Sequence, residues 1–125
     1  MGKDIDAVVE KARKDKDVLA VSVFGSFARG EKNRDIDICL FLNKGKSKFE
    51  MSKKRLEYLS EFNSKLDIQV FQLLPIVIRH RVLKEGKILL CKDIDTLYDM
   101  AYAFVKEYED FMPIYNKYIG VAEHD

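Results

Sequence analysis

The sequence lacks a large excess of charge of either sign, because its 125 residues include 22 lysines and arginines and 21 aspartates and glutamates. A net charge of +1 gives no electrostatic case for a dedicated nucleic-acid binder, so we expect no direct nucleic-acid binding. Proline and glycine are also scarce, with two and six residues, whereas hydrophobic residues make up 47%. This composition argues against a disordered chain and predicts a single globular domain over residues 1–125.

Cysteine is rare as well, and the two that occur, Cys39 and Cys91, show no metal-ligand spacing. We expect both to be reduced core thiols of an intracellular protein. No apolar stretch approaches the length of a membrane span, and the N-terminus carries acidic residues instead of a signal-peptide pattern. The sequence therefore predicts a cytoplasmic protein with no membrane association.

Hydrophobic periodicity predicts a chain in which helices and strands alternate. The expected strands are 18–24, 35–43, 65–71 and 87–91, and the expected helices run from the N-terminus to about 16, from 48 to about 62, from 75 to 86 and from about 95 to 119. Strand 18–24 is apolar on both faces apart from Ser22, which indicates a central position in a sheet. Pro113 is expected to kink or restart the last helix.

Two carboxylates are predicted to meet on one face of the strand 35–43. Asp35 and Asp37 lie one residue apart, and side chains at i and i+2 of a strand point the same way. Buried negative charges must be paired or neutralised, and a divalent cation does this for both. The backbone N–H groups of the preceding Gly25-Ser26 turn can hold phosphate, which favours the magnesium ion of a nucleotide.

The same Asp-Ile-Asp pattern occurs twice more in places that indicate a structural role. Asp4-Ile-Asp6 falls in the opening turn of the first helix, where acidic residues complement the helix dipole. Asp93-Ile-Asp95 precedes the last helix, where it can cap the helix N-terminus. Only the middle copy lies within an apolar strand.

Asp67 is the predicted third member of the cluster, on the same side of strand 65–71 as Gln69. Together with Asp35 and Asp37 it could hold two magnesium ions about 4 Å apart, and it could accept the proton of an attacking hydroxyl. The alternative is a solvent-facing Asp67 at a strand edge.

Phosphate contacts are expected from the turn that follows the first strand. Gly25 lets the chain turn sharply and lets phosphates approach the backbone, and Ser26 offers a hydroxyl and an N–H group. Arg29 and Gly30 extend this turn, and Arg29 is expected to face either the phosphates or the aspartates.

The stretch Gly25–Gly30, followed by Asp35-Ile-Asp37 and then Asp67, resembles the polymerase-β-type nucleotidyltransferase superfamily. More narrowly, it is similar to the minimal nucleotidyltransferases (MNT), the antitoxins of prokaryotic MNT–HEPN toxin–antitoxin pairs. The resemblance spans about Ala20 to Tyr118. It implies an α/β (α+β) nucleotidyltransferase fold, with a small, mixed, mostly antiparallel central sheet flanked by helices.

The resemblance also implies an activity. Such proteins bind MgATP through the glycine-serine turn and the aspartates, and transfer AMP to a tyrosine of a HEPN-type toxin. One alternative is a catalytically weak nucleotide-binding antitoxin that neutralises its partner by binding alone. Another is nucleotidyl transfer to a small molecule.

An apolar stripe with 4-3 spacing runs along the last predicted helix. It consists of Leu97, Ala101, Phe104, Tyr108, Phe111, Tyr115 and Tyr118. It would pack on the protein's own sheet or face a partner protein. The sequence leaves a homo-oligomer open.

Overall fold

A computed structural model describes residues 2–25, 36–62 and 65–120 of the chain. The elements, in order, are α1 (Gly2–Lys14), β1 (Val18–Phe24), β2 (Ile36–Leu42), α2 (Lys48–Glu61), β3 (Leu66–Val70), a 3-10 turn (Phe71–Leu73), α3 (Ile76–Glu85), β4 (Lys87–Cys91), α4 (Ile94–Tyr115) and a π-helical segment (Asn116–Gly120). The chain divides into two compact units, Met1–Asp93 and Ile94–Asp125.

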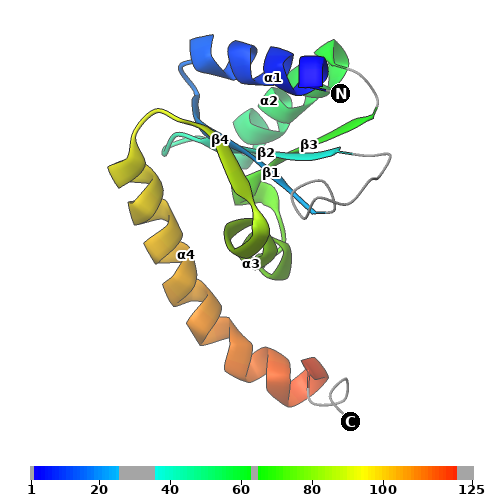
Figure 1. Cartoon of the computed structure of the whole chain (residues 1–125). Coiled ribbons are helices and arrows are strands. Elements are labelled where there is room, and N and C mark those ends of the chain that lie inside the picture. Colours follow the sequence, from blue (N-terminus) through cyan, green and yellow to red (C-terminus); the bar gives the residue numbers. More distant parts are fainter. Residues whose placement is uncertain (1, 26–35, 63–64, 121–125) are drawn as a thin grey trace. The chain divides into compact units, whose positions relative to one another are not determined.

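The first unit is built on one four-stranded sheet with the order β3-β2-β1-β4 (Figure 1). Strand β1 is antiparallel to both β2 and β4, whereas β2 and β3 are parallel. Helix α2 connects the two parallel strands, as a parallel pair requires a crossover connection. The sheet is therefore mixed and mostly antiparallel, and the predicted fold class is confirmed.

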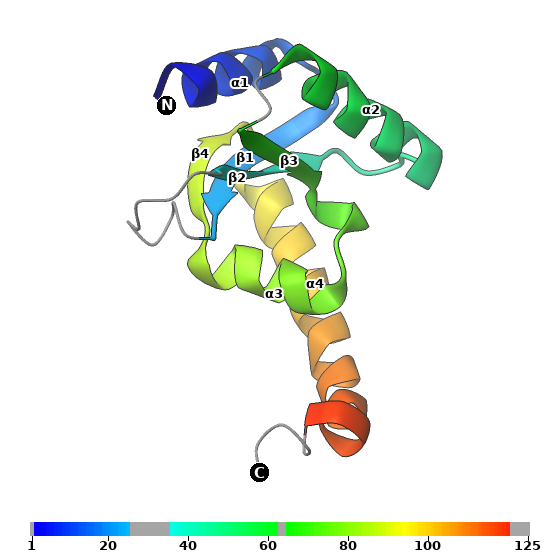
Figure 2. The ribbon, with the colours of Figure 1, turned by 90° about the vertical axis from the view of Figure 1, so that its right-hand side faces the viewer.

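Helices α1 and α2 cover one face of this sheet, as both ribbon views show (Figures 1 and 2). Alternate residues of β2 and β3, and two residues of the same face of β1, point into the core that these helices close. Its main members are Ile5, Val8 and Ala12 of α1, Met51 and Tyr58 of α2, Val21 and Val23 of β1, Ile36, Ile38, Leu40 and Leu42 of β2, and Leu66, Ile68 and Val70 of β3. We call this the core face.

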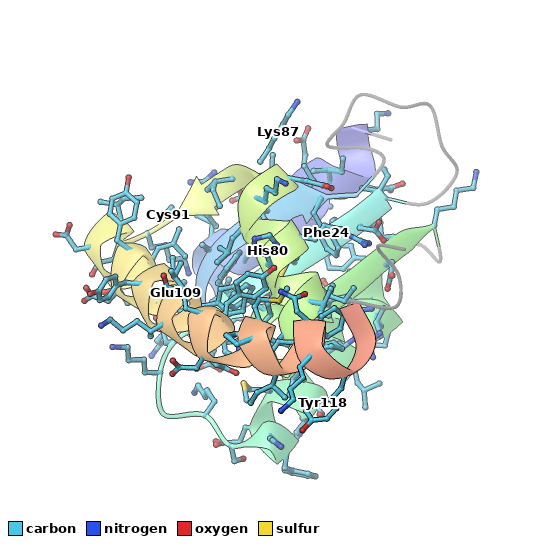
Figure 3. The ribbon with its side chains drawn as sticks, turned by 90° about the horizontal axis from the view of Figure 1, so that it is seen from below. Phe24, His80, Lys87, Cys91, Glu109 and Tyr118 are labelled. Atoms are coloured by element: carbon cyan, nitrogen blue, oxygen red, sulfur yellow. The ribbon has the colours of Figure 1, made fainter. Side chains whose placement is uncertain are left out.

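The opposite face of the sheet lies toward α3 (Figure 2). Helix α3 contacts β1, and Figure 3 shows α3, which carries His80, in front of the sheet. The helix ends at Gly86, where an added Cβ would lie 3.4 Å from the carbonyl oxygen of Val23. We call this side of the sheet the second face, and it carries Asp37 and Asp67.

A half-buried ionic cluster joins α2 to the segment that precedes β1. The Tyr58 hydroxyl donates to Asp15 Oδ2 at 2.9 Å, and Lys54 Nζ lies 3.1 Å from the same oxygen. Lys54 also pairs with Asp17 at 3.1 Å. Burial raises the pKa of Asp15, but hydrogen bonds from the Asp17 backbone, Tyr58 and Lys54 outweigh burial and hold that pKa below its ordinary value.

The second unit consists of α4 and the π-helical segment that follows it. Ring contacts run along the predicted stripe at i, i+4 spacing, with centroids 5.8 Å apart for Phe104 and Tyr108 and 5.6 Å apart for Phe111 and Tyr115. Pro113 lies inside α4, which continues to Tyr115 before it changes to π geometry. Of the expected kink or restart at this residue, the restart is therefore wrong and the kink stays a prediction.

The predicted bounds of strands 18–24 and 87–91 are confirmed, whereas the strand predicted at 65–71 is shorter, because Phe71 already begins a 3-10 turn. Both cysteines are free, and Cys39 is buried as expected. The expectation of a core position is wrong for Cys91, which is half-buried in the edge strand β4. Within the described residues, no helix is long and apolar enough to cross a membrane.

The Tyr58–Asp15 hydrogen bond predicts a pH-dependent mutational effect. Tyr58→Phe should lower the free energy of unfolding by about 1.5–3 kcal/mol at about pH 7, because a charged acceptor loses its donor. The lowered pKa of Asp15 means that its stabilisation is present above the ordinary value of 3.8 and is lost as pH falls through the folded-state value. The loss of free energy of unfolding caused by Tyr58→Phe, measured by chemical denaturation, should therefore be smaller at about pH 3 than at about pH 7.

Tyr98→Phe is the matched control, because this tyrosine is 66% exposed. It should change stability by less than about 0.5 kcal/mol at either pH. An equal cost of Tyr58→Phe at both pH values would contradict the assignment of that cost to the Asp15 carboxylate.

Candidate active site

Asp37 of β2 and Asp67 of β3 are direct partners in the parallel register of the two strands. Neighbouring strands lie about 4.8 Å apart, and register partners point to the same face. Both residues are half-buried on the second face, so two carboxylates stand side by side there. The structure thus brings together two of the three predicted aspartates, which lie 30 positions apart in the sequence.

Gly25, directly after β1, lies against the Asp37 side chain of this pair. Phe24 is the register partner of Asp37, and Gly25 follows it with a φ of +74°. A Cβ at Gly25 would collide with Asp37 Oδ2 and would lie 3.4 Å from Asp37 Cγ. Glycine is therefore required here both for the left-handed backbone and for the close approach of the carboxylate.

The other predicted site residues, Asp35, Ser26, Arg29 and Gly30, lie outside the described residues. Among the residues that are described, no group of three or more His, Cys, Asp or Glu side chains could hold a metal ion. Asp37 and Asp67 alone form the observed part of the cluster. Their assignment as metal ligands remains a prediction.

Gln69 belongs to the site, although the sequence pattern assigned it only a face and no role. Its Nε2 group donates a hydrogen bond of 2.9 Å to Asp67 Oδ1. Both side chains are half-buried on β3, two positions apart, and therefore point to the same face. The strand alternation was the available signal, but it does not reveal a hydrogen bond.

The second face becomes apolar away from the carboxylates. Cys39 is the register partner of both Ser22 and Gln69, and burial raises the pKa of its thiol well above the ordinary value. Farther along, the rings of Phe41 and Phe71 stack with centroids 4.6 Å apart. The polar end of this face is thus the end next to Gly25.

The described donors suit magnesium. Mg²⁺ prefers hard oxygen ligands and usually takes one or two protein carboxylates together with phosphate oxygens. Asp37 and Asp67 supply two such carboxylates on one face, and the missing side chain of Gly25 leaves room for the Asp37 carboxylate to approach the turn. These residues could therefore hold the ion of a nucleotide, and Asp67 could also accept a proton.

A cavity of about 240 Å³ lies elsewhere, at the Leu42 end of β2. Three lysines and three carboxylates contribute to its lining, which consists of Asp17, Leu42, Lys46, Glu50, Lys53, Lys54 and Glu57. Several of these charges pair with one another, including Lys46 with Asp17 at 2.6 Å. Because Asp37 is at the opposite end of the strand, this cavity is separate from the candidate active site.

Comparisons with known proteins identify relatives of the chain. Residues 6–95 match the family described as Polymerase beta, Nucleotidyltransferase. A Methanocaldococcus jannaschii protein named as a protein adenylyltransferase is 30% identical over 95 residues, which cover 74% of this chain and 71% of that protein.

Two solved structures share the fold over almost the whole chain. A toxin–antitoxin structure with AMP-PNP aligns with a TM-score of 0.71 and 19% identity, covering 94% of this chain and 98% of that chain. The complex of tri-AMPylated Shewanella oneidensis HEPN toxin with MNT antitoxin aligns with a TM-score of 0.70 and 16% identity, covering 98% of each chain.

The contact between Gly25 and Asp37 predicts a measurable coupling. Gly25→Ala should destabilise the protein by about 1–2 kcal/mol for the positive φ, and by about 1–3 kcal/mol more for the collision. Gly45→Ala is the matched control, because Gly45 has a φ of +90° with nothing within 4 Å of an added Cβ. Gly45→Ala should lower the free energy of unfolding only by the amount expected for the positive φ, about 1–2 kcal/mol.

A double-mutant cycle isolates the contribution of the Asp37 carboxylate to the destabilisation caused by Gly25→Ala. In an Asp37→Ala background, the additional cost of Gly25→Ala over Gly45→Ala should disappear in chemical denaturation. If the additional cost persists without the carboxylate, the collision with Asp37 is not its cause.

Proposed function

Because the chain belongs to the polymerase-beta nucleotidyltransferase family and is a nucleotidyltransferase, we propose that it transfers AMP from MgATP to a tyrosine of a HEPN-type toxin and so acts as an antitoxin. The observation that carries the proposal is the in-register pair of Asp37 and Asp67 beside the Gly25 turn. This arrangement provides acidic oxygens where a nucleotide's phosphates and its cation would meet.

The relatives support three parts of this assignment, which are a protein acceptor, an adenine nucleotide as donor and a toxin as partner. The Methanocaldococcus jannaschii relative is named as an adenylyltransferase of proteins, which favours a protein acceptor. One structure with the same fold contains AMP-PNP, which favours an adenine nucleotide as donor. Another is an MNT antitoxin in complex with an AMPylated HEPN toxin, which favours a toxin as the acceptor.

In the proposed reaction, the tyrosine oxygen of the acceptor attacks the α-phosphorus of ATP. The bond from the α-phosphorus to the bridging oxygen breaks, pyrophosphate leaves, and AMP remains on the tyrosine. Asp67 accepts the proton of the hydroxyl, since a general base must stand at the attacking group. A bound Mg²⁺ would supply neutralisation of the charge on the phosphates.

In this proposal, the residues of the turn after β1 bind the phosphates and the aspartates bind the metal. The backbone of Gly25 and the groups of Ser26, Arg29 and Gly30 bind and orient the phosphates. Asp35, Asp37 and Asp67 would hold the magnesium, with two ions expected if all three carboxylates take part.

The test is AMP transfer measured by intact-protein mass spectrometry. The protein is incubated with MgATP and with a candidate HEPN-type toxin, and the mass gain of AMP is followed over time. Asp37→Asn and Asp67→Asn should each lower the rate by about a hundredfold or more. Both keep the size of the side chain and remove its charge.

The chain offers a matched control in the Asp-Ile-Asp sequence of α1. Asp4→Asn with Asp6→Asn makes the same chemical change on a helix away from the second face, and should leave the rate within about twofold. No AMP on the partner with the wild-type protein, together with full neutralisation of the toxin by Asp35→Ala plus Asp37→Ala, would show that the protein acts by occlusion alone.

A further inference from the structure

The Asp67 carboxylate is held by a neutral donor. Gln69 Nε2 donates to Asp67 Oδ1 at 2.9 Å, from the position two residues farther along β3. Among residues 2–25, 36–62 and 65–120, no lysine, arginine or histidine forms an ion pair with Asp67. Within the part of the chain that the structure describes, Gln69 therefore fixes its orientation without cancelling its charge.

This distinction matters for the chemistry of a carboxylate beside Asp37. A lysine or arginine at the position of Gln69 would fix the side chain equally well, but it would compete with any cation for the same negative charge. An amide donates one hydrogen bond and leaves the full charge on the carboxylate. It also occupies one oxygen, Oδ1, and so favours one orientation of the group.

Gln69 is itself held in a confined place. Its register partner is Cys39, which is fully buried, and the stacked rings of Phe41 and Phe71 follow farther along the same face. The Cys39 thiol is a weak hydrogen-bonding group, and the two phenylalanine rings have no hydrogen-bonding group. A polar amide in this row is therefore directed toward the carboxylates, where Asp67 accepts its hydrogen bond.

We propose that Gln69 is a positioning residue, which holds the Asp67 carboxylate in the orientation needed to bind the cation and to accept the acceptor's proton. The inference rests on the proposed function, because it assigns a role within the same site. Groups that orient a metal-binding side chain commonly contribute tenfold to a hundredfold to metal affinity or activity. Gln69 acts through Asp67 and is not expected to touch the nucleotide.

Gln69→Met tests this, because methionine keeps the length of the side chain and removes the donor. We expect kcat for AMP transfer to fall about tenfold, with KM for ATP within about twofold. A second measurement does not depend on turnover. The affinity for Mn²⁺ in the presence of AMP-PNP, followed by electron paramagnetic resonance, should fall about tenfold.

Gln72→Met is the matched control. Gln72 is also a half-buried glutamine, and its side chain exchanges hydrogen bonds with the backbone of Leu42, with Nε2 to the Leu42 oxygen at 2.6 Å. It holds the other end of β2, so its loss should lower stability without a change in kcat or Mn²⁺ affinity. Equal losses of kcat in both variants would overturn the proposal, because they would indicate a general structural effect.

Gln69→Glu gives an independent test in case the methionine variant does not fold. It keeps the shape and polarity of the side chain but places a second carboxylate against Asp67, so kcat should fall by more than in Gln69→Met. A Gln69→Met protein with wild-type kcat and Mn²⁺ affinity would refute the role of Gln69 and leave the proposed function intact. A wild-type protein without AMP transfer would refute the function, while Mn²⁺ affinity unchanged by Gln69→Met would separately refute the positioning role.

Discussion

The parallel register of β2 with β3 is the constraint on which the site depends. Asp37 and Asp67 become neighbours only because Ile36 pairs with Leu66 and Ile38 with Ile68. Those apolar partners are buried in the core that α1 and α2 close. A shift of one residue in β3 would turn its apolar side chains toward the second face and Asp67 into the core, at the cost of a buried charge. The hydrophobic core therefore sets the register, and the register sets the site.

The second face shows how one pair of strands can support both packing and chemistry. Its apolar end, with the stacked rings of Phe41 and Phe71, lies on the same strands as its acidic end. The acidic end coincides with the turn after β1, where Gly25 lets the Asp37 carboxylate approach the backbone. Because a strand alternates strictly, the residues on this face can vary in polarity without changing the core face.

Much of this could be predicted from local pattern. Strand 18–24 was identifiable from its continuous apolar run, and the alternation of 65–71 placed Asp67 and Gln69 on one face. The register between β2 and β3 could not be predicted, since it depends on packing against α2 across a long sequence separation. Nor could the Gln69 hydrogen bond, because alternation fixes a face and leaves the side-chain rotamer undetermined. The continuation of α4 from Pro113 to Tyr115 was not predicted either, because the helix-breaking preference of proline does not fix the residue at which a helix ends.

Two carboxylates in direct register also oppose folding, because like charges opposite one another on neighbouring strands repel. The fold tolerates this arrangement through the apolar core on the other face and through the neutral hydrogen bond from Gln69. A cationic side chain in place of that amide would reduce the repulsion and would compete with the proposed metal ion for the same negative charge. The same repulsion between the two carboxylates would favour the proposed binding of a cation at this pair.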